Sequence, residues 1–205
     1  MSHQTVKLDL MLKNCLFPNP YCAFCSFVPI NPTLIQLILP YVKNIRISNH
    51  KTFAGLAERG HSPIDWFYGF KLHIVINDKS EIIAVKITKG NKDDRKAFED
   101  MAIKKDLHGK VYADKGYISK NLFAKLYRKG LTLITGIKRN MKNYLMPILD
   151  KILLRKRFII ETIFGYIKEN FNLRPNKQRS PTNFFASLFS ALIAFQLLPN
   201  KPSIS

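Results

Sequence analysis

The chain has 205 residues, of which 46% are hydrophobic, so it is long enough and apolar enough to bury a core, and wholesale disorder is excluded. Its 33 Lys and Arg residues against 14 Asp and Glu give a net charge of +19, which attracts a polyanion. Nucleic acid is the first candidate, because neutralising phosphates releases counterions. An acidic membrane surface is the alternative, although the longest apolar stretch, 184–198, is too short and too polar to span a bilayer comfortably.

The predicted elements become clear only in the second part of the chain. Residues 1–50 contain five prolines between positions 18 and 40, dense enough to break regular structure, and residues 51–65 indicate a loop or a short helix. Alternating hydrophobic residues then predict strands over 67–76 and 82–88. The remaining predicted elements are helix 95–105, strand 110–113, helix 121–129, strand 131–137, a cationic loop 138–142, a long helix 147–171 and an apolar helix 183–198. This order predicts a mixed α/β fold built in layers.

Asp114 follows the predicted strand 110–113 and precedes Lys115-Gly-Tyr117. A carboxylate at the carboxyl end of a strand, beside a glycine turn, lies where ligands collect in α/β folds. The alternative is an aspartate that caps the next turn, which is the more common role of Asp in such a place. Asp114 is therefore a candidate ligand or catalytic residue only in combination with other features.

Glu161 lies in the long predicted helix, four residues after Arg157 and seven before Lys168. Spacings of four and seven place these side chains on one helical face. Isoleucines and Phe164 occupy most of the remaining helix surface, so the helix should be largely buried. A charged side chain on a buried helix is costly unless it is paired or bound to metal. The alternative is a surface ion pair with Arg157, worth roughly 0.2–0.5 kcal/mol.

Together these motifs resemble the DDE transposases of bacterial insertion sequences, most closely the 982-type group. The resemblance rests on strand-Asp114-Lys-Gly-Tyr followed by Arg157-x3-Glu161-x6-Lys168. Further motifs that look like the group are Gly69-Phe-Lys-Leu-His73, Asn77-Asp-Lys79, Gly90-Asn-x-Asp-Asp-Arg95, Leu153-Leu-Arg-Lys-Arg157, Arg46-Ile47, His50-Lys51 and the closing apolar helix. The resemblance covers about residues 43–205, and one departure is Leu154, where related families often have Tyr.

The resemblance implies an RNase H-like mixed sheet flanked by helices, with three carboxylates that bind two Mg²⁺ or Mn²⁺ ions. Asp114 and Glu161 match the second and third of these carboxylates. Two ions can stabilise the attacking and leaving oxygens of a displacement at phosphorus at once. The implied activity is DNA strand cleavage and strand transfer at transposon terminal repeats and target DNA, by a homo-oligomer assembled on DNA in the cytoplasm, associated with the nucleoid and with no membrane partner.

Basic residues would contact DNA by the same resemblance, although for any one of them a solvated basic surface is the alternative. The predicted DNA contacts are Arg157, Lys168, Lys115, Lys138, Arg139, Lys142, Arg174, Lys177 and Arg179.

The first carboxylate of the family is missing. In the family it ends the first strand, in Asp-Ser-Thr, and the matching location is Ile35, within Leu34-Ile-Gln-Leu37. The codons TTG ATT CAA CTT would encode these residues, and in a shifted frame they contain GAT TCA ACT, which encodes Asp-Ser-Thr. We therefore predict that residues 1–42 are an atypical, out-of-frame segment ahead of a catalytic domain over 43–205, with the first strand missing or disrupted. The coding DNA around codons 1–50 tests this hypothesis.

Three functions remain open on the sequence alone. The first is a transposase whose cleavage is impaired by loss of the first catalytic aspartate. The second is a non-catalytic DNA-binding remnant that binds transposon ends. The third is a resolving or repair nuclease with the same fold, which strand joining through a free 3′-OH would distinguish from a transposase.

Overall fold

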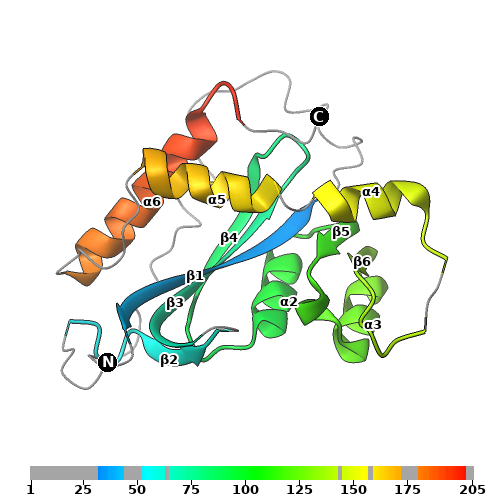
Figure 1. Ribbon diagram of the computed structural model, residues 1–205, viewed down its shortest axis with the longest axis horizontal. Coiled ribbons are helices and arrows are strands. Elements are labelled where there is room, and N and C mark those ends of the chain that lie inside the picture. The colour runs from blue at the N-terminus through cyan, green and yellow to red at the C-terminus, as the bar shows by residue number, and fades with distance from the viewer. Residues whose placement is uncertain are drawn as a thin grey trace.

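A six-stranded mixed sheet forms the centre of the computed structural model, which describes residues 32–43, 52–62, 65–142, 145–156, 159–171 and 180–201 (Figure 1). The strands are β1 (Thr33–Lys43), β2 (Glu58–His61), β3 (Trp66–Ile76), β4 (Ile82–Lys89), β5 (Gly109–Ala113) and β6 (Leu131–Thr135). The helices are α2 (Asp94–Lys104), α3 (Lys120–Arg128), α4 (Ile148–Lys156), α5 (Ile159–Asn170) and α6 (Pro181–Leu197), with a short 3-10 helix, η3 (Lys115–Tyr117). The predicted α/β class, a mixed sheet flanked by helices, is confirmed.

The first strand of the sheet is present, so the prediction that it is missing or disrupted is wrong. β1 lies between β3 and β5, antiparallel to the former and parallel to the latter. Leu34 is buried in the core on one side of the sheet and Leu39 in the core on the other, which stabilises the strand. The ladder shifts register between Pro40 and Val42, and such a bulge accommodates a residue that lacks a backbone N–H. Proline density therefore misled the prediction for this segment.

β2 is a further difference from the prediction, because the sequence indicated a loop or short helix there. It pairs with the beginning of β3, whereas β4 pairs with the rest of β3 on the same side. A Cβ atom on Gly60 would come within 3.0 Å of the Gly90 carbonyl, so these two glycines allow β2 to approach the end of β4. The other predicted elements agree with the observed ones to within two residues at each end. The predicted long helix is present as α4 and α5, and residues 157 and 158 between them lie outside the described residues.

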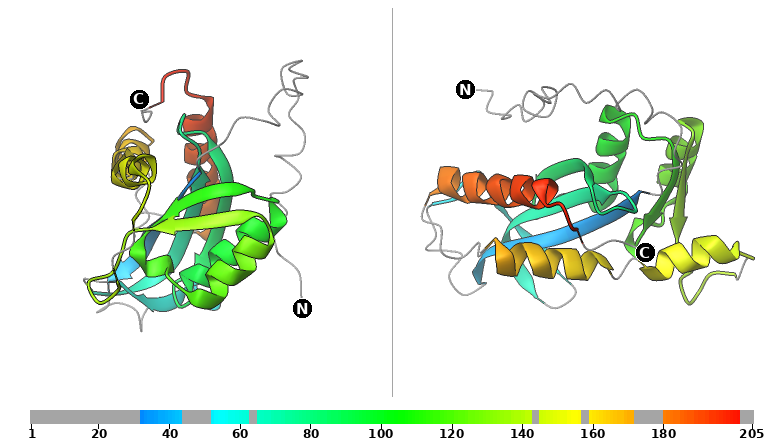
Figure 2. Two further views of the ribbon diagram at one scale, coloured as in Figure 1. Left: turned by 90° about the vertical axis from the view of Figure 1, so that its right-hand side faces the viewer. Right: turned by 90° about the horizontal axis from the view of Figure 1, so that it is seen from above.

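Helices cover both faces of the sheet (Figure 2). α5 and α6 pack on one face, where Phe70, Leu72 and Ile74 of β3 share a core with Ile163 and Phe184. α2 and α3 pack on the other face, in a second core. α4 lies beside β5 and β6 in a smaller third cluster. Of the helices described, none is long and apolar enough to cross a membrane.

Two motifs of the sequence are joined in one buried polar contact between β3 and the start of α2. Lys71 Nζ donates to Asp94 Oδ1 at 2.9 Å and to the Lys92 carbonyl at 3.0 Å. His73 is fully buried on the same face of β3, with its Nε2 2.9 Å from Thr88 Oγ1. The motif 69–73 and the motif 90–95 therefore hold α2 against the sheet. Because burying a charge is costly without a partner, this pairing accounts for a lysine in a core strand.

Candidate active site

Asp114 lies directly after β5, as predicted, and its carboxylate is exposed. Its Oδ1 accepts a hydrogen bond of 2.6 Å from the Lys115 backbone N–H, so the side chain caps η3. The turn-forming role that the sequence left open is therefore present. Because a carboxylate has about four lone-pair sites on its two oxygens, the capping role does not by itself exclude ligand binding at this position.

The parallel pairing of β1 with β5 is close in sequence to position 35 and to Asp114. Thr33 pairs with Tyr112, and two residues further along both strands the chain reaches Ile35 and Asp114. Neighbouring strands are about 4.8 Å apart, so continuing this register two residues past the Thr33–Tyr112 pair would bring the backbone at position 35 beside that of Asp114. The location that motif spacing assigned to the first carboxylate is thus two residues beyond the strand pair that Asp114 also follows by two residues. The residue there is isoleucine, which has no ligand atom.

Glu161 is exposed in the first turn of α5. Lys168 is exposed on the same face, two turns later, whereas Ile163 and Ile167 are buried. Glu161 and Lys168 therefore share a polar face as predicted, but Thr162, Glu169 and Asn170 are exposed as well, so the prediction of a largely buried helix is wrong for α5. Ile163 shares a core with Ile74, which is the register partner of Ile35 in β3. α5 thus packs on the sheet face that includes the β3 residue beside position 35.

The residues present do not fit the two-ion centre that the resemblance implies. Within the part of the chain that the structure describes, no three His, Cys, Asp or Glu residues gather closely enough to hold a metal ion. Two further aspartates lie elsewhere: Asp78 is exposed in the turn between β3 and β4, and Asp94 is paired with Lys71. Asp114 and Glu161 therefore stand without a third carboxylate among the described residues.

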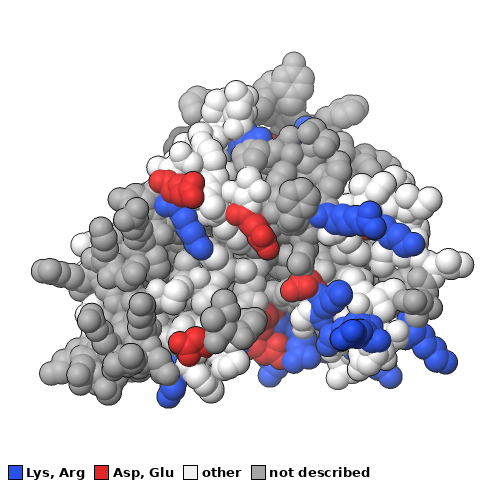
Figure 3. All heavy atoms as spheres, in the orientation of Figure 1, with Lys and Arg blue, Asp and Glu red and all other residues white. Residues whose placement is uncertain are grey.

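Four of the predicted DNA-binding cations follow Asp114 or β6 and are exposed: Lys115, Lys138, Arg139 and Lys142. The Lys115 stem lies against Gly136, where an added Cβ would be 3.0 Å from Lys115 Cε. This contact places Lys115 beside the loop that carries the other three. Figure 3 shows Lys and Arg atoms over α4 and over the β5, β6 and α3 region, whereas Asp and Glu atoms lie nearer the centre and left of this face. Arg157, Arg174, Lys177 and Arg179 lie outside the described residues.

Sequence reasoning missed a buried carboxylate, Asp150 of α4. Asp150 is 5% exposed, and its Oδ1 accepts from the Tyr112 hydroxyl at 2.8 Å and from Lys110 Nζ at 3.1 Å. Burial, and then the hydrogen bond to Asp150, raise the pKa of Tyr112 above its usual value, so this hydroxyl stays a donor. The only signal in the sequence was an acid within an apolar helix. Asp150 joins α4 to the strand that ends at Asp114.

Replacing Asp150 by alanine should lower the free energy of unfolding by about 1–3 kcal/mol, because the Tyr112 hydroxyl would be left buried without an acceptor. Urea unfolding followed by circular dichroism measures this change. Glu169→Ala is the control, because Glu169 is exposed on α5 and its removal should change stability by less than about 0.5 kcal/mol. Equal stabilities for both variants would show that Asp150 does not anchor α4.

Among the solved structures to which this chain is similar are two complexes. The chain is similar to the cryo-EM structure of a piggyBac transposase synaptic complex with hairpin DNA, at TM-score 0.40 and 14% identity, over 71% of this chain and 32% of that one. It is also similar to a simian T-cell lymphotropic virus intasome in complex with the PP2A regulatory subunit B56 gamma, at TM-score 0.41 and 11% identity, over 88% of this chain and 60% of that one. The chain thus spans about a third and three fifths of these two chains.

No curated protein matches the sequence. The model of one protein family, described as a transposase DDE domain, matches residues 32–181, which is well over half of the chain and includes β1, Asp114 and Glu161. The chain therefore belongs to the transposase DDE domain family.

Proposed function

We propose that this chain is the catalytic domain of a DNA transposase that binds the terminal repeats of a mobile element but cleaves and joins strands poorly or not at all. The family membership supports DNA transposition as the process. The observation that supports impairment is the isoleucine at position 35, which follows Thr33 by two residues as Asp114 follows Tyr112, the partner of Thr33 in the sheet. A divalent-metal centre of the family type would need Asp114, Glu161 and a carboxylate at this third position.

DNA is the partner that the electrostatics favour. The net charge of +19 gives the chain a strong attraction for a polyanion. Three exposed lysines lie beside Asp114 or in the loop next to it: Lys115, Lys138 and Lys142. Their charges can neutralise phosphates on DNA that approaches the end of β5. A homo-oligomer on DNA and a nucleoid location are part of the same proposal. The chain's own coding DNA, read in the other frames around codon 35, tests whether an Asp-Ser-Thr motif has been lost.

DNA binding should survive loss of the metal site and should depend strongly on salt. We expect Asp114→Ala to bind terminal-repeat DNA as tightly as the unchanged chain in the absence of metal, because it removes no cation. If about five phosphates are neutralised, affinity should fall by about 10²–10³-fold between about 50 and about 200 mM salt. Fluorescence anisotropy with labelled duplex measures both quantities.

A second experiment tests whether the cationic loop 138–142 contributes to DNA binding. Replacing Lys138, Arg139 and Lys142 together by alanine should reduce the salt slope by about 3. The matched control removes the same charge from three exposed lysines elsewhere, Lys79, Lys96 and Lys104. If the control reduces the slope as much as the loop variant, binding is a property of net charge and the proposed interface is wrong.

A non-catalytic DNA-binding remnant is the second candidate, favoured by the same isoleucine at position 35. The two candidates differ in whether the remaining site can still act. Detectable Mg²⁺-dependent nicking or strand joining that disappears in Asp114→Ala supports an impaired transposase. Tight binding with no such activity at any Mg²⁺ or Mn²⁺ concentration supports the remnant.

A further inference from the structure

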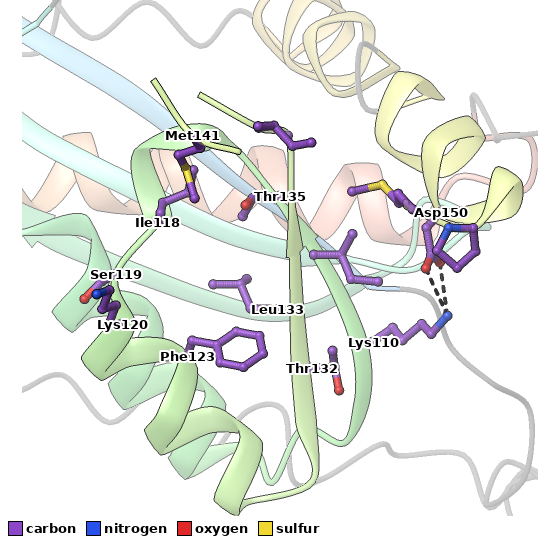
Figure 4. A pocket seen from close by; sticks show the side chains of 15 residues that line it. Lys110, Ile118, Ser119, Lys120, Phe123, Thr132, Leu133, Thr135, Met141 and Asp150 are labelled. Atoms are coloured by element: carbon purple, nitrogen blue, oxygen red, sulfur yellow. Dashed lines mark hydrogen bonds and ion pairs between the residues drawn. The ribbon is translucent and has the colours of Figure 1, made fainter. Parts of the chain in front are cut away.

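A groove of about 580 Å³ runs along β6, bounded by α3, by the segment after β6 and by α4 (Figure 4). Phe123 and Met141 project into it in the close-up, together with Leu133 of the strand. Phe123 is 45% exposed and Met141 46%, which is unusual for large apolar side chains that converge on one site. The groove lies outside the candidate active site but belongs to the same end of the molecule.

The groove begins where the turn after Asp114 ends. Ile118 and Ser119 line it, four and five residues beyond Asp114. Gly136 lines it from the other side and is in contact with the Lys115 stem. A DNA strand whose phosphate is held beside Asp114 therefore has its neighbouring nucleotides within reach of the groove.

The charge around the groove favours a polyanion. Lys110 and Lys120 line it, and Lys138 and Lys142 flank Met141 in the loop above. Among the described residues that line it, Asp150 is the one acid, and Lys110 and Tyr112 bond to it. A second copy of a chain with net charge +19 would bring cations against cations, so a copy of this protein is disfavoured as the occupant.

The apolar lining decides which part of a nucleic acid fits. Phosphates and sugars gain nothing from Phe123, Leu133 and Met141, whereas the flat apolar face of a base can stack on an aromatic ring. Ser119 and Thr132 line the groove as well; the Ser119 oxygen accepts from the Leu122 N–H as the cap of α3, and its hydroxyl proton can be donated to a base edge. We propose that this groove binds an unpaired nucleobase of the DNA held at Asp114. The proposal rests on the proposed function, since it takes DNA to be the partner.

The test compares three labelled duplexes of one sequence in a metal-free buffer: one fully paired, one with a single bulged base and one with an abasic residue at the bulge. We expect the unchanged chain to bind the bulged base about tenfold more tightly than either of the others, as base–aromatic stacking allows. Phe123→Ala should lose this preference while keeping its affinity for the paired duplex. The Phe123 side chain is 45% exposed, so its removal should leave the fold intact, and a thermal melt checks that the variant folds.

Trp66→Ala is the matched control, because Trp66 is an aromatic residue of 46% exposure at the β2 end of β3, away from the groove. We expect it to keep the preference for the bulged base. Equal binding of all three duplexes, or a preference that is lost in Trp66→Ala and kept in Phe123→Ala, would overturn the proposal. So would Phe123-dependent binding of an acidic apolar peptide, Asp-Leu-Thr-Ile-Glu-Asp, without any preference for the bulged base. Failure to bind any of the duplexes would instead contradict the proposed function.

Discussion

Replacing Ile35 by aspartate is expected to raise Mg²⁺-dependent cleavage of terminal-repeat DNA by about 10²-fold or more, the scale on which single charge-stabilising groups act in active sites. The expected gain follows from the register of the sheet, because continuing the Thr33–Tyr112 pairing by two residues would set position 35 beside Asp114. An aspartate there would complete a set of three carboxylates with Asp114 and Glu161. Cleavage of end-labelled terminal-repeat duplex on a denaturing gel measures the rate.

The control is Ile35→Asn, which introduces a polar side chain of the same shape as aspartate but no negative charge. It should gain much less activity than Ile35→Asp, and adding Asp114→Ala to Ile35→Asp should abolish the gain. Mn²⁺ titration calorimetry provides a readout apart from turnover, and Ile35→Asp should bind Mn²⁺ more tightly than either control. If Ile35→Asp folds and binds DNA but shows no gain in cleavage or Mn²⁺ affinity, the missing carboxylate is not what limits this chain.

Which parts of the fold the sequence could predict depended on how each segment is stabilised. The hairpin of β3 and β4 and the helices α2, α3 and α6 have local patterns of apolar residues, and they were predicted correctly. β1 was not, because its stability comes from pairing with β3 and β5 on both sides, and Pro40 conceals the alternation. β2 is short and reads Glu58-Arg-Gly-His61, so only its pairing with β3 defines it as a strand.

The candidate site shows the same division between local and non-local information. The positions of Asp114 and Glu161 followed from residues close to them in sequence: a strand end and a helical stripe. The relation between position 35 and Asp114 depends on a parallel pairing between segments about eighty residues apart, which no local pattern of residues could indicate. Asp150 carried no signal of its role, because its partners Tyr112 and Lys110 are on a different strand.

The fold should lose stability as the pH falls from about 6.5 to about 4, by about 3 kcal/mol, because of His73. Burial lowers the pKa of His73 from 6.5 to about 4, Asp94 opposes this shift, and Lys71 and Lys86 add to it. Within the described residues its Nδ1 is buried without a hydrogen-bond partner, so a proton there would be a donor without an acceptor. Between these pH values the unfolded chain binds the proton and the folded chain does not, so the free energy of unfolding falls as the pH falls. Urea unfolding at a series of pH values measures the loss.

His73→Gln separates this effect from other acid-sensitive contacts, because glutamine can hydrogen bond with Thr88 but does not titrate. The variant should be less stable than the unchanged chain at neutral pH, where the imidazole fits its site, and its stability should vary much less between pH values of about 6.5 and about 4. The two curves are therefore expected to converge as the pH falls. Parallel curves would mean that His73 is not the group responsible, and would direct attention to the Lys71–Asp94 pair, which holds α2 on the same face of β3.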